Sequence, residues 1–222
     1  DEETATNYYD ATKYVEGMAD PYIFWDEQSG YYYMTGSYFP EDGDEIDAND
    51  KTQQYDRVVL RRSRTLEGLQ DRSKQVTIWK VGNQGFDNDG IEVSSGYRYL
   101  WAPEIHRVGN YWVVYFTESH SSLFDIYCHA LILDGSKDPY ETALTSSSQA
   151  SKWEDYKMLA SDDDASGKIS GKDITPFKAS FCLDMTYFKD EVNGKSYVIW
   201  AGKPVGNSDL FLAEVDEEQP WK

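Results

Sequence analysis

Three stretches of the chain share one order of apolar and polar positions. Each begins with a short apolar strand, continues through a polar turn that contains glycine, and ends in a strand rich in Tyr, Trp and Val. This order predicts antiparallel β-hairpins, because a period of two with a glycine-containing turn suits paired strands. The three predicted hairpins cover residues 19–38, 101–119 and 183–202.

Further strands are predicted between and after the hairpins, at residues 55–63, 125–133 and 208–216. No long segment shows the 3.6-residue period of an amphipathic helix. Units of three to four strands, repeated along a chain, are typical of a β-propeller. We therefore predict an all-β fold of the propeller class, with polar surface loops at residues 40–54, 142–152 and 161–173.

Alignment of the three hairpins places Asp20, Ala102 and Asp184 in one column, at equal spacings of 102 − 20 = 82 and 184 − 102 = 82 residues. Asp184 stands between Leu183 and Met185, in a strand that otherwise has the pattern of a buried one. A buried carboxylate costs several kcal/mol unless it is paired or hydrogen-bonded. The position therefore indicates either a partner for this carboxylate or a chemical role.

The composition narrows the class of ligand. The 222 residues suit one large all-β domain, and their formal net charge of −19, from 40 acidic and 21 basic residues, would repel nucleic acid and anionic lipid. No apolar run reaches the roughly 18 residues of a membrane span. An aromatic content of 15% favours flat ligands such as sugar rings. We predict an exported protein that acts on neutral ligands; the alternative is that the acidity serves only solubility.

Three other sets of residues bear on disulfide and metal chemistry. Cys128 and Cys182 could form one disulfide or remain buried thiols. The acidic triple at residues 162–164 lacks the glycine and the distal Glu of a calcium loop, and is read as a solvated charge run. The histidines lack the spacing of zinc ligands, and they are His106, His120 and His129.

Several motifs in a fixed order carry a family resemblance. They are "ADPYI" with "GYYYMTGS", then "LWAPEIH", then "FCLDMTYF" with "NGKSYVIWAG". From about residue 17 onward the chain resembles the five-bladed β-propeller glycoside hydrolases of family 43, particularly the α-L-arabinofuranosidase-like branch. The resemblance implies that residues 1–222 are the N-terminal part of one catalytic domain and supply roughly its first three blades. A second chain or segment would complete the propeller.

The resemblance also implies catalytic roles. Asp20, of the first-blade Asp-Pro motif, corresponds to the general base, and Asp184 to the aspartate that orients the catalytic acid and raises its pKa. The family's acid is a Glu in a fourth-blade Glu-Gly-Pro motif, which this chain lacks, so the acid is expected outside it. Glu217 and Glu218 in the tail are not candidates, because they lack that context.

The implied reaction is inverting hydrolysis that removes arabinose from plant polysaccharides or oligosaccharides. A β-xylosidase of the same family and a non-catalytic carbohydrate-binding propeller are the alternatives. Three residues are candidates for substrate binding: Trp101 as a sugar platform, Glu104 as a hydroxyl acceptor and Phe39 as a pocket wall. Each also has a structural interpretation: a core Trp, a backbone-bonded Glu and a loop hydrophobe. Likewise, Asp20 could cap a turn and Asp184 could be a satisfied structural carboxylate.

For ligands and location, the resemblance implies no required cofactor and a central calcium ion that, where present, is held outside this chain. The partner is an arabinose- or xylose-containing oligosaccharide or polysaccharide, and the location is secreted or cell-surface. Asp56 and Arg57 could pair with each other or contact a sugar, and pairing is favoured because exposed Asp–Arg pairs are common. The choice between arabinose and xylose, and between exo and endo action, stays open.

Overall fold

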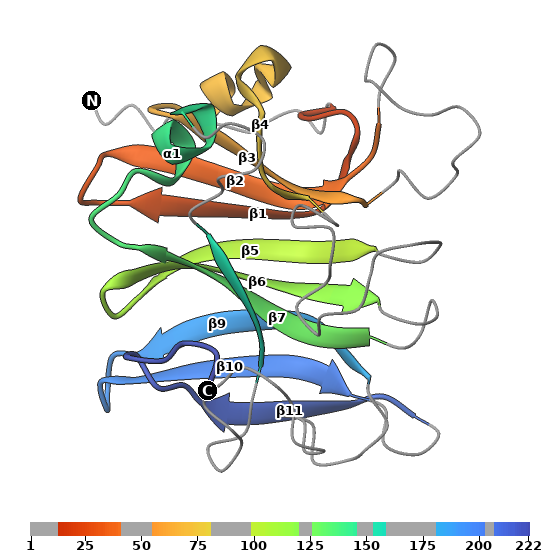
Figure 1. Cartoon of the computed structure of the whole chain (residues 1–222), viewed down its shortest axis with the longest axis vertical. Coiled ribbons are helices and arrows are strands. Elements are labelled where there is room, and N and C mark those ends of the chain that lie inside the picture. Colours follow the sequence, from red (N-terminus) through yellow and green to blue (C-terminus); the bar gives the residue numbers. More distant parts are fainter. Residues whose placement is uncertain are drawn as a thin grey trace, which may run out of the picture.

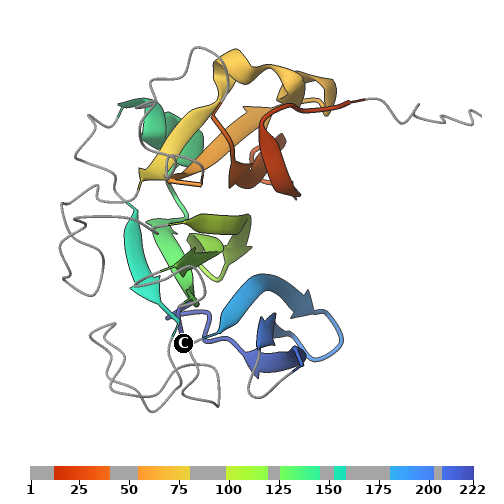
Figure 2. The ribbon, with the colours of Figure 1, turned by 90° about the vertical axis from the view of Figure 1, so that its right-hand side faces the viewer.

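The computed structural model describes residues 13–40, 55–80, 99–119, 126–145, 153–158, 181–202 and 207–222. The described strands form three antiparallel sheets, which we call blade 1, blade 2 and blade 3 in chain order. Figure 1 shows the blades stacked as successive layers, and the side view of Figure 2 shows the same succession along the molecule. The predicted all-β architecture of repeated sheets is therefore confirmed.

Blade 1 is a four-stranded sheet in the order β1-β2-β3-β4. The predicted hairpin at 19–38 forms its first two strands, and the strand predicted at 55–63 forms the third. The fourth strand and the two short 3₁₀ helices that precede it were not predicted. The elements are β1 (Met18–Asp26), β2 (Tyr31–Tyr38), β3 (Arg57–Ser63), η2 (Glu67–Gln70), η3 (Arg72–Lys74) and β4 (Val76–Lys80).

Blade 2 repeats this arrangement in the order β5-β6-β7-β8. One expectation is wrong here, because the residues at 142–145, predicted as the start of a loop, belong to a short helix. Asp138 caps that helix by accepting the backbone N–H groups of Tyr140 and Glu141. The elements are β5 (Leu100–Val108), β6 (Tyr111–Ser119), β7 (Ile126–Asp134), α1 (Pro139–Thr145) and β8 (Glu154–Lys157).

Blade 3 has three strands in the described residues, in the order β9-β10-β11. The predicted hairpin at 183–202 and the strand at 208–216 account for all of them. The loops predicted at 40–54 and 161–173, and the acidic triple at 162–164, lie almost entirely or wholly outside the described residues. The strands are β9 (Cys182–Asp190), β10 (Lys195–Gly202) and β11 (Asp209–Glu214).

Two hydrophobic cores hold the blades together, one on each face of blade 2. Side chains of β6 alternate between them, as a strand period of two requires. Trp112, Val114 and Phe116 lie in the core shared with blade 1, whereas Val113 and Tyr115 lie in the core shared with blade 3. All five are fully buried, and burial of each such side chain stabilises the fold by about 1.5–3 kcal/mol. The middle blade is therefore apolar on both faces.

A disulfide and an ion pair are among the links between neighbouring blades. A disulfide between Cys128 of β7 and Cys182 of β9 connects blades 2 and 3, which settles the open question about these cysteines. Between blades 1 and 2, the Arg107 guanidinium forms two hydrogen bonds to the Asp26 carboxylate, at 2.7 and 3.0 Å, and lies over the Trp112 ring. None of the helices in the described ranges has the length and apolar character needed to cross a bilayer.

Candidate active site

The aligned column of the sequence is a real structural repeat. Asp20 in β1, Ala102 in β5 and Asp184 in β9 each have a left-handed backbone, with φ values of 49°, 47° and 54°. Each stands where the pairing of its strand with the next shifts register. A β-bulge of this kind re-aims side chains, and a left-handed non-glycine residue costs about 1–3 kcal/mol. The first strand of every blade therefore bends at one equivalent residue, and at two of these residues an aspartate is presented.

The negative charge of Asp20 acts on the carboxylate of Asp184. Burial raises the pKa of Asp184, and the negative charges of Asp20 and Glu104 raise it further. One expectation needs correction, because the Asp184 side chain is exposed, whereas the neighbouring Met185 is buried. The bulge turns Asp184 out of the core, so this carboxylate meets protein on one side and solvent on the other. We call the end of the first strands that carries Asp20, Ala102 and Asp184 the acid end.

Glu104 is held by a chain of side chains that crosses all three blades. Its Oε2 atom accepts hydrogen bonds from Thr186 Oγ1, at 2.8 Å, and from His106 Nε2, at 3.0 Å. Because His106 donates through Nε2, its Nδ1 accepts from the Tyr22 hydroxyl, at 3.2 Å. Burial lowers the pKa of His106, although Glu104 opposes this, and burial followed by the charge of Glu104 raises the pKa of Tyr22 to about 12. Both groups are therefore neutral near pH 7, and one carboxylate is fixed beside Asp184.

Aromatic side chains gather next to Asp20. Trp101 is partly buried and stacks on Tyr99, with ring centroids 5.5 Å apart and planes 12° apart. Tyr55 contacts Trp101, Tyr99 and Phe39 edge-on, at centroid distances of 6.1, 5.6 and 4.7 Å. The charge of Asp20 contributes, after burial, to raising the pKa of Tyr55. The structure thus brings Phe39 and Trp101 together through Tyr55, close to Asp20.

Sequence reasoning missed Tyr55 and Tyr99. Tyr55 has a left-handed backbone, with φ of 61°, and it bridges blades by accepting the N–H of Leu100 and donating its own N–H to Tyr38. A single tyrosine ahead of a strand gives no signal of this in the sequence. The neighbouring residues behave as predicted, because Asp56 and Arg57 pair with each other at 2.6 and 3.0 Å.

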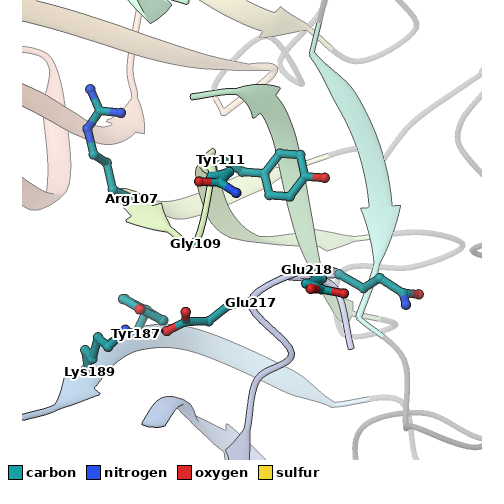
Figure 3. A pocket seen from close by; sticks show the side chains of 9 residues that line it. Arg107, Gly109, Tyr111, Tyr187, Lys189, Glu217 and Glu218 are labelled. Carbon is teal, nitrogen blue, oxygen red and sulfur yellow. Dashed lines mark hydrogen bonds and ion pairs between the residues drawn. The ribbon is translucent and has the colours of Figure 1, made fainter. Parts of the chain in front are cut away.

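The opposite end of the first strands is different, and we call it the ion-pair end. A groove of about 800 Å³ lies there between the β5–β6 turn, β9 and the C-terminal segment. Figure 3 shows Glu217 extending toward Lys189, with Glu218 set apart from that pair. Glu217 accepts hydrogen bonds from Lys189 Nζ and Ser196 Oγ, both at 2.6 Å, and these lower its pKa. Glu217 is thus held beside Lys189, near the end of β9 opposite to the end that carries Asp184.

Among the described residues, one group of side chains able to ligate a metal lies in blade 2, on β6, β7 and β8. His129 Nδ1 is 3.0 Å from Asp155 Oδ1 and 3.4 Å from Glu118 Oε2, and all three side chains are buried. Of the other histidines, His106 is engaged with Glu104, and residue 120 lies outside the described residues. The calcium expectation concerns residues beyond this chain and stays a prediction.

The architecture and the acid end together define a class of protein. It is an all-β protein of propeller blades that presents carboxylates and aromatic rings at one end of the first strands of its blades. Comparison with known proteins agrees with this class. The family model for glycosyl hydrolases family 43 matches residues 14–220, and the chain belongs to that family.

Individual relatives give the same picture. The chain is 31% identical over 212 residues to an extracellular exo-α-(1→5)-L-arabinofuranosidase of Streptomyces chartreusis, and 28% identical over 212 residues to α-L-arabinofuranosidase B of Pyricularia oryzae. These matches cover 93% of this chain but 48% and 33% of those proteins. The crystal structure of an α-L-arabinofuranosidase from Lactobacillus brevis matches with a TM-score of 0.58 at 27% identity, over 95% of this chain and 52% of that one. The chain therefore spans one third to one half of these relatives, and its three blades are part of a five-bladed propeller fold.

Proposed function

We propose that this chain supplies the first three blades and the base side of the active site of an inverting glycoside hydrolase, an α-L-arabinofuranosidase that removes arabinose from plant polysaccharides or oligosaccharides. The observation that carries the proposal is the coupling of Asp20 and Asp184 at equivalent bulges of two blades. Structural carboxylates normally have a cationic partner, as Asp26 has in Arg107. At the acid end, by contrast, the negative charges of Asp20 and Glu104 add to burial in raising the pKa of Asp184, and a carboxyl group perturbed in this way is typical of a reaction site.

In the proposed mechanism Asp20 is the general base. An inverting hydrolase needs a carboxylate that deprotonates water on one face of the sugar and a carboxylic acid that protonates the leaving oxygen on the other, with the two roughly 6.5–9.5 Å apart. The acid, a glutamate, is expected outside this chain. Asp184 would act on it as Asp20 and Glu104 act on Asp184, since a nearby negative charge keeps a carboxyl group protonated to higher pH.

The substrate-binding part of the proposal concerns the residues around these carboxylates. Trp101 and Phe39 belong to the aromatic group beside Asp20, where a partly exposed ring can stack against a sugar. The Oε2 atom of Glu104 accepts from His106 and Thr186, and no described residue forms a hydrogen bond with Oε1. We propose that Oε1 accepts a hydrogen bond from a sugar hydroxyl.

The rest of the propeller is proposed to cover the outer face of blade 3. On that face Leu210, Leu212 and Phe188 have exposed fractions of 74%, 59% and 43%. Leu212 pairs with Ile199 of β10, so these side chains share one apolar surface. Large exposed apolar patches mark contact surfaces, and the opposite face of the same sheet already packs on blade 2. A further blade, on the same polypeptide or on a second chain, fits this surface.

Export is proposed on two grounds. The Streptomyces relatives are named as extracellular enzymes. The disulfide between blades 2 and 3 suits an oxidising compartment, because such bonds are rare in the reducing cytosol.

The experiment uses the complete propeller and two substrates, an aryl α-L-arabinofuranoside and an aryl β-D-xyloside. The proposal predicts faster turnover of the arabinoside, with inversion seen by NMR of the first-formed sugar. Asp20→Ala should lower kcat by about 10²–10⁴-fold, the usual contribution of a positioned base, and leave thermal unfolding unchanged.

Each alternative gives a different result. Preferred turnover of the xyloside would identify a β-xylosidase of the same family. Sugar binding without turnover of either substrate would identify a non-catalytic carbohydrate-binding propeller. Near-normal kcat in Asp20→Ala would remove Asp20 from the role of base.

A further inference from the structure

Two hydroxyl side chains occupy the same place in successive blades. Ser37 of β2 pairs with Ala19, the residue before Asp20, and Thr117 of β6 pairs with Trp101, the residue before Ala102. Both hydroxyl-bearing residues have no exposed surface. They therefore lie at equivalent positions beside the bulges of the acid end.

Each hydroxyl reaches across to the next blade and accepts the backbone N–H of the left-handed residue there. Ala102 N–H donates to Ser37 Oγ at 2.8 Å, and Asp184 N–H donates to Thr117 Oγ1 at 3.2 Å. A bulge leaves a backbone group unpaired in its own sheet, and these hydroxyls satisfy that group from the preceding blade. Two left-handed residues are thus held from outside their own sheets.

Ser37 does more than hold the next blade. Its Oγ donates to Asp20 Oδ2 at 2.6 Å. Since a lone pair of this oxygen already takes the Ala102 N–H, the single hydroxyl hydrogen is directed to the carboxylate. The Oδ2 atom of Asp20 is therefore tied to Ser37, whereas no residue in the described ranges forms a hydrogen bond with Oδ1, which makes Oδ1 the better placed atom to receive a proton.

We propose that Ser37 and Thr117 are positioning residues for the carboxylates of Asp20 and Asp184, each fixing an aspartate of the active site relative to a neighbouring blade. The inference rests on the proposed function for its kinetic consequences. Ser37 sets the rotation of the Asp20 carboxylate and points Oδ1 toward the water, whereas Thr117 fixes the backbone from which Asp184 projects.

The chain itself argues against a purely structural need for these hydroxyls. In blade 3 the equivalent position, paired with Leu183 before the bulge, is Ala201, so the second strand of a blade forms without a hydroxyl at this position. The hydroxyl is therefore not required to build the strand. A hydroxyl is present at the interface between blades 1 and 2 and at the interface between blades 2 and 3, where it forms hydrogen bonds with residues of the acid end.

A matched control exists two residues from Ser37. Thr35 is also fully buried, and its hydroxyl also crosses from blade 1 to blade 2, where it donates to the Pro103 carbonyl at 2.5 Å. Within the described part of the chain, its hydroxyl forms no hydrogen bond with a carboxylate. Loss of the Thr35 hydroxyl removes a buried inter-blade hydrogen bond and leaves Asp20 in place, so Thr35→Val separates stability from positioning.

The test compares Ser37→Ala and Thr117→Val with Thr35→Val in the complete propeller, by kcat, KM and thermal unfolding. Ser37→Ala should lower kcat on the order of 10- to 100-fold with KM unchanged, because misplacement of a reacting group acts on the transition state. Thr117→Val should lower kcat about tenfold, and Thr117→Ser, which keeps the hydroxyl, should restore it. Thr35→Val should unfold at a lower temperature but keep wild-type kcat.

The outcomes separate the claims. Equal kcat in Ser37→Ala, Thr35→Val and wild type would overturn the positioning role while the proposed function stands. Equal loss of kcat in Ser37→Ala and Thr35→Val would assign the effect to blade packing and also overturn it. If Ser37→Ala does not fold, the test uses Thr117 alone. A kcat that is lower in Thr117→Val than in Thr117→Ser would support the positioning role, and equal kcat values in the two variants would overturn it. A wild-type protein that hydrolyses neither glycoside rejects the proposed function itself.

Discussion

The two ends of the first strands, the ion-pair end and the acid end, both carry aspartate carboxylates, but the surroundings shift the carboxylate pKa in opposite directions. At the ion-pair end, burial alone would raise the pKa of Asp26, but hydrogen bonds from Arg107 and Ser29 and the charge of Arg107 outweigh burial and lower it. At the acid end, the pKa of Asp184 is raised by burial and by neighbouring carboxylates. One end is stabilised by its charges, and the other carries charges that cost stability. Carboxylates kept at such a cost are expected to serve the reaction.

The largest effect expected on stability comes from the ion-pair end. Asp26→Asn leaves Arg107 beside a neutral group, and removing one partner of a buried pair should lower the free energy of unfolding by about 3 kcal/mol. Because the folded-state pKa of Asp26 is lowered, this contribution is complete above the ordinary aspartate value near pH 4 and is lost as the pH falls through the lowered value. Urea unfolding at pH 7 and at successively lower pH measures both. A stability difference between wild type and Asp26→Asn that persists undiminished in strong acid would contradict the pairing of Asp26 with Arg107. The kcat of Asp26→Asn should equal that of wild type.

A smaller effect of opposite sign is expected at the acid end. The folded-state pKa of Asp184 is raised, so stability falls as the pH rises from about 4 through the raised value, and the penalty is complete above it. Asp184→Asn should therefore stabilise the protein near pH 7, by less than about 1 kcal/mol because solvent screens this exposed group. The same variant should lose turnover. Lower stability at pH 7 in the variant would show that Asp184 has a structural partner after all.

The smallest effect should come from the exposed pair at the ion-pair end. The side chains of Lys189 and Glu217 are 50% and 35% exposed, and a surface ion pair contributes little. Lys189→Ala should change neither the thermal unfolding temperature nor kcat measurably. A marked loss of kcat there would mean that the groove at this end takes part in the reaction, and the contrast between the two ends would fail.

Much of the fold was readable from the sequence because hairpins are local. The glycine turns and Tyr-rich strands at 19–38, 101–119 and 183–202 all form hairpins. The fourth strands, β4 and β8, were missed, because "VTIWK" and "EDYK" are too short to show a period. Their place follows from pairing with strands already formed.

Only those residues of the candidate site that stand in the sequence repeat could be predicted from the sequence. The spacing of Asp20 and Asp184 identified one column, and both residues lie at equivalent bulges. Ser37 could not be found in this way, because its partner Ala102 is 65 residues away and a serine in "TGSY" has no signature. The exposure of Asp184 was also hidden, since a bulge reverses the alternation that predicts burial.

The most direct test of the contrast is the titration of the Asp184 carboxyl carbon by NMR, in wild type and in two variants. The pKa of Asp184 should lie above the ordinary aspartate range in wild type and should fall in Asp20→Asn, because a neighbouring negative charge has been removed. It should not move in Asp26→Asn, which alters the far end of the same strand. An Asp184 pKa that is the same in wild type and in Asp20→Asn would show that the two aspartates do not share a site.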